Sequence, residues 1–113
     1  MLYKVEIITK QERQDVLKNA LREIGVAGMT ITNVLGCGNQ KGKTEVFRGN
    51  TIVVDFLPKI RFEILCDEGL KDKIIETTLA TINSGNVGDG KIIILPVEDV
   101  IRIRTGEKGK QAI

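Results

Sequence analysis

The stretch GCGNQKGKTEVFRGNTIVVDFLPK, residues 36–59, decides how the rest of the chain is interpreted. It separates two segments that are typical of β-strands, residues 29–35 and 60–65. It has no helical period, and it is far longer than the ~4–6 residues that usually connect two elements. Its glycine-rich polar start could offer backbone amides to an anion, and its apolar end could contact a partner. A surface insertion without a function is the alternative.

The segment before this loop is predicted to form a strand and a helix. Residues 2–8 are apolar and include β-branched members, which is typical of a strand. Thr9 and Glu12 then have the spacing of a capping box, which begins a helix. This helix should end at Gly25, after apolar residues at helical spacing: Val16, Leu17, Ala20, Leu21 and Ile24.

The segment after the loop repeats the pattern of helix and strand. Asp67 is a candidate N-cap for a second helix. Its apolar stripe is predicted to comprise Leu70, Ile74, Ile75, Leu79 and Ile82. A turn-forming cluster at 83–90 leads to a strand at 91–97, and residues 100–104 are predicted to be extended. The order β-α-β-β-α-β predicts an α+β ferredoxin-like fold, with one antiparallel sheet and both helices on one face.

Composition narrows the possible functions. The 113 residues suit a single domain, 1–113, and no apolar run approaches the ~18 residues of a membrane span. The N-terminus lacks the pattern of a signal peptide, so a cytoplasmic location is expected, with Cys37 and Cys66 as free thiols. The absence of histidine removes the commonest general base and zinc ligand. A net charge of only +2 argues against general nucleic-acid binding.

The segment Gly85–Lys91 matches the first part of a phosphate-binding loop, Gly-x-x-x-x-Gly-Lys. The next residue is Ile92 instead of a magnesium-binding Ser or Thr, and the segment follows a helix and opens a strand, which argues against a P-loop NTPase. Glycine-rich amides and a terminal lysine could still hold phosphates. An ordinary turn with a solvated lysine is the alternative.

Other cations could bind small anions. In an extended segment, Arg102 and Arg104 should leave the same face, where two guanidinium groups suit a polyphosphate or a carboxylate. Ordinary charges on a solvated edge strand are the alternative. Lys59 and loop amides could hold a small dicarboxylate, with the oxygen of Gln40 left for a metal. Arg48 is the natural tip residue of the loop, or else a solvated arginine.

These residues carry a close resemblance to the PII family of nitrogen-regulatory signal-transduction proteins. The blocks that resemble the family's hallmarks lie at 36–45, 54–59, 88–92 and 100–107, and the match covers essentially the whole chain. The resemblance implies a ferredoxin-like fold, a homotrimer, and competitive binding of ATP or ADP in the clefts between subunits. It also implies that the large loop, roughly residues 37–55, engages partner proteins and that 2-oxoglutarate binds with Mg²⁺ and ATP at its root.

The resemblance also implies roles for individual residues. The nucleotide contacts would be Gly28, Met29, Thr30, Gly36, Glu63, Ile64, Gly88, Asp89, Gly90, Lys91, Arg102 and Arg104. The 2-oxoglutarate contacts would be Gln40, Lys41, Gly42 and Lys59, and Gln40 would also bind Mg²⁺. Arg48 resembles the residue that family members insert into the cytoplasmic mouth of an ammonium transporter.

The chain departs from the family pattern in the large loop. Ile52 stands where many members have a modifiable tyrosine, and Asn50 stands where some have a phosphorylated serine. Asn39 replaces a frequent arginine and Cys37 a frequent aromatic residue. The resemblance therefore implies a response to ligands without tyrosine nucleotidylylation.

The resulting hypothesis is a non-enzymatic sensor of nitrogen, carbon and energy. It would bind ATP or ADP and 2-oxoglutarate and regulate an ammonium transporter or a nitrogen-metabolism enzyme or regulator, so that it would meet a membrane only through a transporter. One alternative is a sensor of adenylates alone. Another is a slow ATPase in the same cleft, with Glu63 or Asp89 as base. A nucleic-acid binder is disfavoured because the chain has only three Phe and one Tyr.

Overall fold

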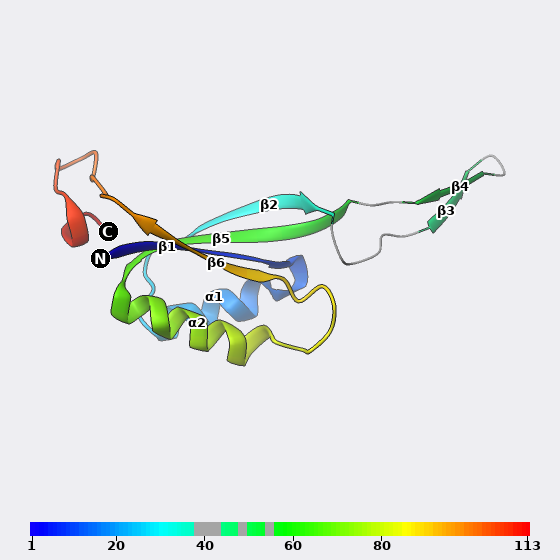
Figure 1. Cartoon of the computed structure of the whole chain (residues 1–113), viewed down its shortest axis with the longest axis horizontal. Helices are drawn as coiled ribbons and strands as arrows, with labels where there is room; N and C mark the ends of the chain where they lie inside the picture. Colours follow the sequence, from blue (N-terminus) through cyan, green and yellow to red (C-terminus); the bar gives the residue numbers. More distant parts are fainter. Residues whose placement is uncertain (38–43, 48–49, 54–55) are drawn as a thin grey trace.

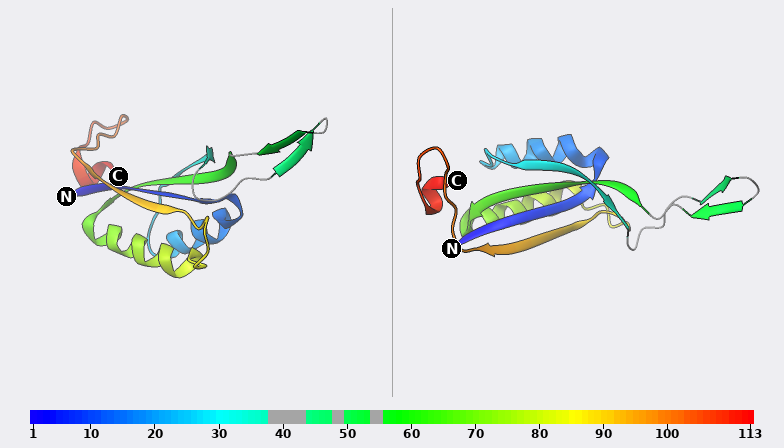
Figure 2. Two further views of the ribbon diagram at one scale, coloured as in Figure 1. Left: turned by 45° about the vertical axis from the view of Figure 1, so that its right-hand side comes forward. Right: turned by 90° about the horizontal axis from the view of Figure 1, so that it is seen from above.

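Figure 1 shows the computed structural model of the chain, which describes residues 1–37, 44–47, 50–53 and 56–113. The main sheet has the strand order β2-β5-β1-β6, and every neighbouring pair is antiparallel. Its strands are β1 (Leu2–Lys10), β2 (Thr30–Gly36), β5 (Leu57–Asp67) and β6 (Lys91–Val97). The helices α1 (Gln14–Glu23) and α2 (Glu68–Ile82) lie on one face of this sheet (Figures 1 and 2). The predicted ferredoxin-like α+β fold is confirmed.

The core lies between the sheet and the two helices. Alternate residues of β1 and β5 point into it, as the two-residue period of a strand requires, and among them Val5, Ile7, Ile60, Phe62 and Ile64 are buried. The helices contribute buried residues from their inner faces: Leu17, Leu21, Ile74 and Ile82. Cys66 is also buried and Cys37 is exposed, and both are free thiols, as predicted.

Neither helix covers the other face of the sheet. A network of ion pairs crosses it, with Lys4 Nζ 3.1 Å from Glu6 and 3.8 Å from Glu63, and Arg61 Nε 3.0 Å from Glu63. Ile93 and Leu95 of β6 share this face with Glu6 and Lys4 through the β1–β6 register, and they are 36% and 38% exposed. We call this surface, made of Lys4, Glu6, Arg61, Glu63, Ile93 and Leu95, the bare sheet face.

The predicted long connection contains further structure. Strands β3 (Thr44–Phe47) and β4 (Asn50–Val53) form an antiparallel pair, which the sequence analysis missed. The connection also ends earlier than predicted, because β5 begins at Leu57 and includes Lys59. None of the helices in the described residues is long and apolar enough to span a membrane.

The predicted capping box at Thr9 and Glu12 is wrong. Thr9 is still part of β1, and its hydroxyl donates a 2.7 Å hydrogen bond to the Asp89 carbonyl. A short 3₁₀ turn, η1 (Gln11–Arg13), comes between β1 and α1 and has no side-chain cap. By contrast, the Asp67 cap is confirmed, because its carboxylate accepts a 2.9 Å hydrogen bond from the Leu70 amide.

The predicted apolar stripe of α2 is partly wrong. Ile74 and Ile82 are buried, but Leu79 is 54% exposed and the preceding residue, Thr78, takes the buried position. Positions 74, 78 and 82 are spaced by four, so they share one helix face. The buried stripe is therefore determined by the position of each residue on the helix and not by its hydropathy, and it includes one polar residue, Thr78.

Residues 100–104 do not form the predicted extended segment. Residues 103–105 are in a turn, closed by hydrogen bonds from the Gly106 amide to the Arg102 carbonyl (2.7 Å) and from the Arg102 amide to the Glu107 carbonyl (2.9 Å). An isolated bridge joins Ile101 and Lys108, and a second 3₁₀ turn, η2 (Gly109–Ala112), follows. The prediction that Arg102 and Arg104 leave one strand face is therefore wrong.

Candidate functional site

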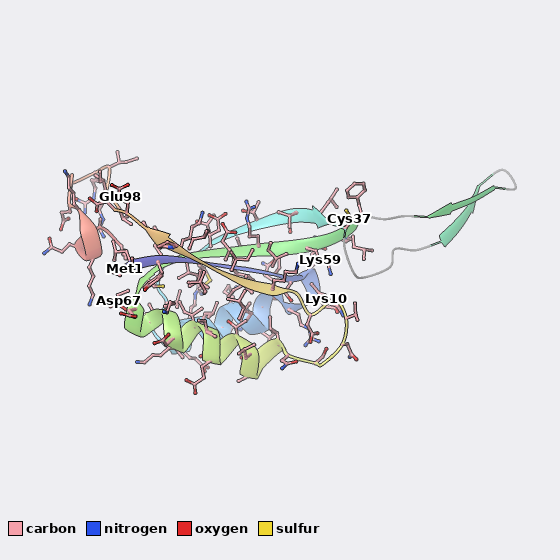
Figure 3. All side chains as sticks on the ribbon, in the orientation of Figure 1. Met1, Lys10, Cys37, Lys59, Asp67 and Glu98 are labelled. Carbon is pink, nitrogen blue, oxygen red and sulfur yellow. The ribbon has the colours of Figure 1, made fainter. Side chains whose placement is uncertain are left out.

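The candidate site is built around the end of the sheet where β2 ends and β5 begins. The register places Val34 beside Lys59, Lys59 beside Lys10, and Lys91 beside Ile8. Figure 3 shows Cys37, Lys59 and Lys10 at this end, whereas Met1, Asp67 and Glu98 lie at the other. We call the first end the loop root.

The turn before β6 forms one side of the loop root. The Asp89 carboxylate closes this turn by accepting hydrogen bonds from the Ser84 hydroxyl and from the amides of Ser84 (2.8 Å) and Gly85 (3.0 Å). The hydrogen bond from the Ser84 side chain is the main reason that the pKa of Asp89 lies below its usual value. Asp89 therefore holds the turn as an anion and is poorly suited to act as a general base.

Gly90 fits against β1 with no room for a side chain. Its φ is +108°, and a Cβ added there would lie 1.8 Å from the Ile8 carbonyl oxygen. The adjoining Asp89 carbonyl accepts the hydrogen bond from Thr9. These contacts hold the turn against the end of β1 and fix where Lys91 enters β6. The amides of Ser84 and Gly85 already donate to Asp89, so a bound anion such as phosphate would use other amides of this glycine-rich turn.

A cavity of about 320 Å³ lies beside this turn. Its walls come from β1, α2 and the start of β6, and they comprise Ile7, Ile8, Thr78, Leu79, Ile82, Asn83, Asp89, Gly90, Lys91 and Ile92. The Thr78 hydroxyl is buried and has no hydrogen-bond partner in the described part of the chain. Lys91 links the cavity to the glycine-rich turn, so both form one continuous surface.

A second group of predicted nucleotide contacts lies around the start of β2. Thr30 is in register with Glu63, and Gly28 and Met29 come just before it. The Glu63 carboxylate is held by the ion pairs of the bare sheet face. The side chain of Ile64 is buried in the core, so it could contact a ligand only through its backbone.

The third group, Arg102 and Arg104, lies beyond the end of β6 that is remote from the loop root. Lys91 and Val97 are the two ends of β6. A strand rises ~3.4 Å per residue, so these two residues are about 20 Å apart. Arg102 contacts Glu107 and Ile113, and Arg104 is exposed. One chain therefore does not bring the three groups together.

The predicted carboxylate site is described only in part. Lys59 lies in β5, and its Cγ would be 3.3 Å from a Cβ added to Gly36, so these two predicted contacts are neighbours. Gln40, Lys41, Gly42 and Arg48 fall outside the described residues, as do the substitutions at Asn39 and the side chains of Asn50 and Ile52.

Sequence reasoning missed Lys10, which is the direct cross-strand neighbour of Lys59. The strand was predicted to end at residue 8, whereas β1 continues to Lys10. Because the two lysines are directly opposite in the register, their side chains leave the same face of the sheet at the loop root. The signal that could have found Lys10 is the alternation of β-branched residues at Val5, Ile7 and Thr9, which extends the strand pattern past residue 8.

Comparison with known proteins gives a consistent result over nearly the whole chain. The profile of the family described as Nitrogen regulatory protein P-II matches residues 2–107. Nitrogen regulatory protein P-II of Azospirillum brasilense is 48% identical over 110 residues, covering 97% of this chain and 98% of the relative. Nitrogen regulatory protein P-II 1 of Escherichia coli K12 is 46% identical with the same coverage.

Solved structures agree with the sequence relatives. The complex of B. subtilis GlnK with ATP has a TM-score of 0.80 at 36% identity, covering 99% of this chain and 97% of that one. Arabidopsis thaliana PII bound to citrate has a TM-score of 0.79 at 36% identity, covering 99% and 92%. The P-II proteins are signal transducers and not enzymes. With this match in both sequence and fold, the chain belongs to the P-II family of nitrogen regulatory proteins.

Proposed function

We propose that this P-II protein is a homotrimeric sensor that binds ATP or ADP between its subunits and 2-oxoglutarate, with Mg²⁺ and ATP, at the loop root. Through residues 37–55 it regulates targets such as an ammonium transporter, with Arg48 as a contact, or an enzyme or regulator of nitrogen metabolism. Because Ile52 replaces the tyrosine of many relatives, the loop responds to ligands without tyrosine nucleotidylylation.

The observation that carries the proposal is the distribution of the predicted nucleotide contacts over one sheet. Gly88–Lys91 lie at the start of β6 and Gly28–Thr30 lie at the start of β2, and β6 and β2 are the two outer strands. A head-to-tail ring of subunits can place the β6 edge of one copy beside the β2 edge of the next. Phosphates would then lie between the glycine-rich turn of one subunit and Arg102 and Arg104 of its neighbour. The ATP complex of B. subtilis GlnK supports adenylate as the ligand.

The bare sheet face supports the same assembly. It presents Ile93 and Leu95 beside an ion-pair network, and neither α1 nor α2 covers it (Figure 2). Partly exposed apolar side chains of this kind gain stability when a second surface removes them from water. In a ring of three copies, these faces meet around the axis.

The neighbouring lysines at the loop root support a dicarboxylate as the second ligand. Lys59 lies beside Gly36, and Lys10 is the cross-strand neighbour of Lys59, while Arabidopsis PII bound to citrate is a related protein that accepts a polycarboxylate. The described residues contain no group of three or more His, Cys, Asp or Glu that could hold a metal ion. In the proposal, Mg²⁺ would be held by Gln40 and by oxygens of ATP and 2-oxoglutarate, because oxygens are the hard donors that it prefers. Its charge would offset the repulsion between phosphate and carboxylate.

Calorimetric titrations test the proposal. ATP with Mg²⁺ is titrated with and without 2-oxoglutarate into wild-type protein, Lys59→Ala and, as a control on the exposed side of α2, Lys73→Ala. We expect 2-oxoglutarate to bind only when Mg-ATP is present, and Lys59→Ala alone to abolish this binding while ADP binding persists. Sedimentation should give the mass of a trimer. Failure of the wild type to bind any adenylate would refute the proposal.

The same titrations separate the two alternatives. If ATP binds and 2-oxoglutarate never does, the protein is a sensor of adenylates alone, in keeping with the replacements at Cys37 and Asn39. Steady ATP turnover that Lys91→Ala removes would instead indicate an ATPase. The lowered pKa of Asp89 disfavours Asp89 as the base of such an enzyme, because a weakly basic carboxylate accepts a proton poorly.

A further inference from the structure

The residues after β6 fold back on themselves and contact Arg102, whose side chain stays 37% exposed. We call residues 105–113 the tail. Besides the Ile101–Lys108 bridge, the amide of Gly109 donates to the Val100 carbonyl (3.0 Å) and to Asp99 Oδ1 (3.0 Å). These contacts place the tail alongside residues 99–102, and Figures 1 and 2 show it folded at the end of the sheet where β6 ends.

The guanidinium of Arg102 contacts two residues of the tail. Arg102 Nη2 donates a 3.1 Å hydrogen bond to the Ile113 carbonyl oxygen, and Nη1 lies 3.6 Å from Glu107 Oε1. A guanidinium binds a phosphate best through two parallel N–H groups. Both terminal nitrogens of Arg102 are already directed toward oxygen atoms of the tail. Arg104, in contrast, is exposed.

A separate contact ties the tail to α2. Lys110 Nζ lies 2.9 Å from Asp67 Oδ2, while Asp67 Oδ1 caps the helix by accepting from the Leu70 amide. The Asp67 carboxylate is fixed by the helix, so it is an anchor that does not move with the tail. Lys110 therefore holds the tail over Arg102 from a point outside the nucleotide contacts.

We propose that the tail is an internal competitor for Arg102, so that a nucleotide phosphate binds this arginine only when residues 107–113 release it. The inference rests on the proposed function, in which Arg102 contacts phosphate. It requires a reciprocal effect, because a ligand that binds the released state better must itself favour release. The tail thus lowers nucleotide affinity, and bound nucleotide loosens the tail.

Lys110→Ala and Lys108→Ala form a matched pair that tests the competition. Each removes one positive charge from the tail, but only Lys110 has the side-chain contact to Asp67, whereas Lys108 pairs with Ile101 through its backbone. If the lysines acted only by attracting the negative charge of ADP, both variants would bind ADP as tightly as wild type or more weakly. Competition predicts that Lys110→Ala binds ADP about two- to fivefold more tightly than Lys108→Ala, the factor that corresponds to an exposed ion pair of about 0.5–1 kcal/mol.

Hydrogen exchange of the wild-type tail amides gives a second measurement. Exchange at residues 106–113 should become faster when ADP is added, although bound ligands usually protect a protein. Equal ADP affinities of the two variants, or slower exchange of the tail with ADP, would overturn the inference. Arg102→Ala separates this from the proposed function: if that variant binds ADP as tightly as wild type, Arg102 is not a nucleotide contact and the proposed site itself is wrong.

Discussion

Replacing Gly90 with alanine is expected to destabilise the protein far more than its small size suggests. The new Cβ would lie 1.8 Å from the Ile8 carbonyl oxygen, whereas contacts of real Cβ atoms stay above 3.0 Å. The obstacle is backbone, so the turn must move away from β1 by roughly the difference, about 1.2 Å. This shift stretches the Thr9–Asp89 hydrogen bond from 2.7 Å to about 3.9 Å, beyond hydrogen-bond range.

The magnitude follows from three contributions. An alanine at the positive φ of Gly90 costs about 1–2 kcal/mol. Losing the Thr9–Asp89 hydrogen bond costs about 1 kcal/mol, and weakening the last pair of the β1–β6 ladder, Ile8 with Lys91, costs about as much again. We therefore expect a decrease of about 3–4 kcal/mol in the free energy of unfolding, together with loss of nucleotide binding because Lys91 is displaced.

Gly25→Ala is the matched control. Gly25 has nearly the same φ, +102°, but nothing lies within 4 Å of an added Cβ, so only the conformational cost of about 1–2 kcal/mol should appear. Urea unfolding at one fixed protomer concentration compares the two variants, since assembly makes stability depend on concentration. If Gly90→Ala loses no more stability than Gly25→Ala, the steric reasoning is wrong.

Two further outcomes follow from single side chains. Thr78→Val keeps the shape of the residue and removes its buried hydroxyl without a described partner, so the unfolding free energy should rise by about 1 kcal/mol in a urea titration; a decrease would mean that the hydroxyl is hydrogen-bonded. The pKa of Asp67 is lowered first by the hydrogen bond from the Leu70 amide and then by the contact with Lys110. The Asp67 carboxylate therefore contributes its full stabilisation above the unfolded pKa of about 3.9, and this stabilisation is lost as pH falls through the lower folded pKa. Asp67→Asn should therefore lose less stability than wild type between pH 5 and pH 2, and equal losses would assign the acid sensitivity to other groups.

The main sheet and helices could be predicted because burial and hydropathy alternate together along β1 and β5. Ile60, Phe62 and Ile64 point into the core while Arg61 and Glu63 do not, which is the pattern that a two-residue period detects. The capping box failed for a non-local reason, since the hydroxyl of Thr9 bonds to Asp89, eighty residues away in sequence. No local pattern contains that partner.

The candidate site was harder to predict because it depends on which strands become neighbours. Lys10 becomes a candidate site residue only because the register places it opposite Lys59. Arg102 and Arg104 were assigned to a strand by their alternation with isoleucines, but Gly106 and Gly109 have positive φ and allow the chain to turn back there. Those two glycines were the available signal. The assignment of the α2 stripe failed because hydropathy favours Leu79, while the helix position buries Thr78.

Gly36 and Leu57 form the last register pair of β2 and β5, so the chain leaves the main sheet and returns to it at adjacent positions. The sheet itself holds the two ends of the connection together, and each doubling of a flexible connection then adds only about 0.6 kcal/mol of closure cost. Sequence and length between these two points can consequently change with little effect on folding. The main sheet can therefore keep its fold while the segment between Gly36 and Leu57 changes, and proteins that share this sheet can acquire new targets in this way. For the same reason, residues 37–56 are the natural place to graft a foreign peptide.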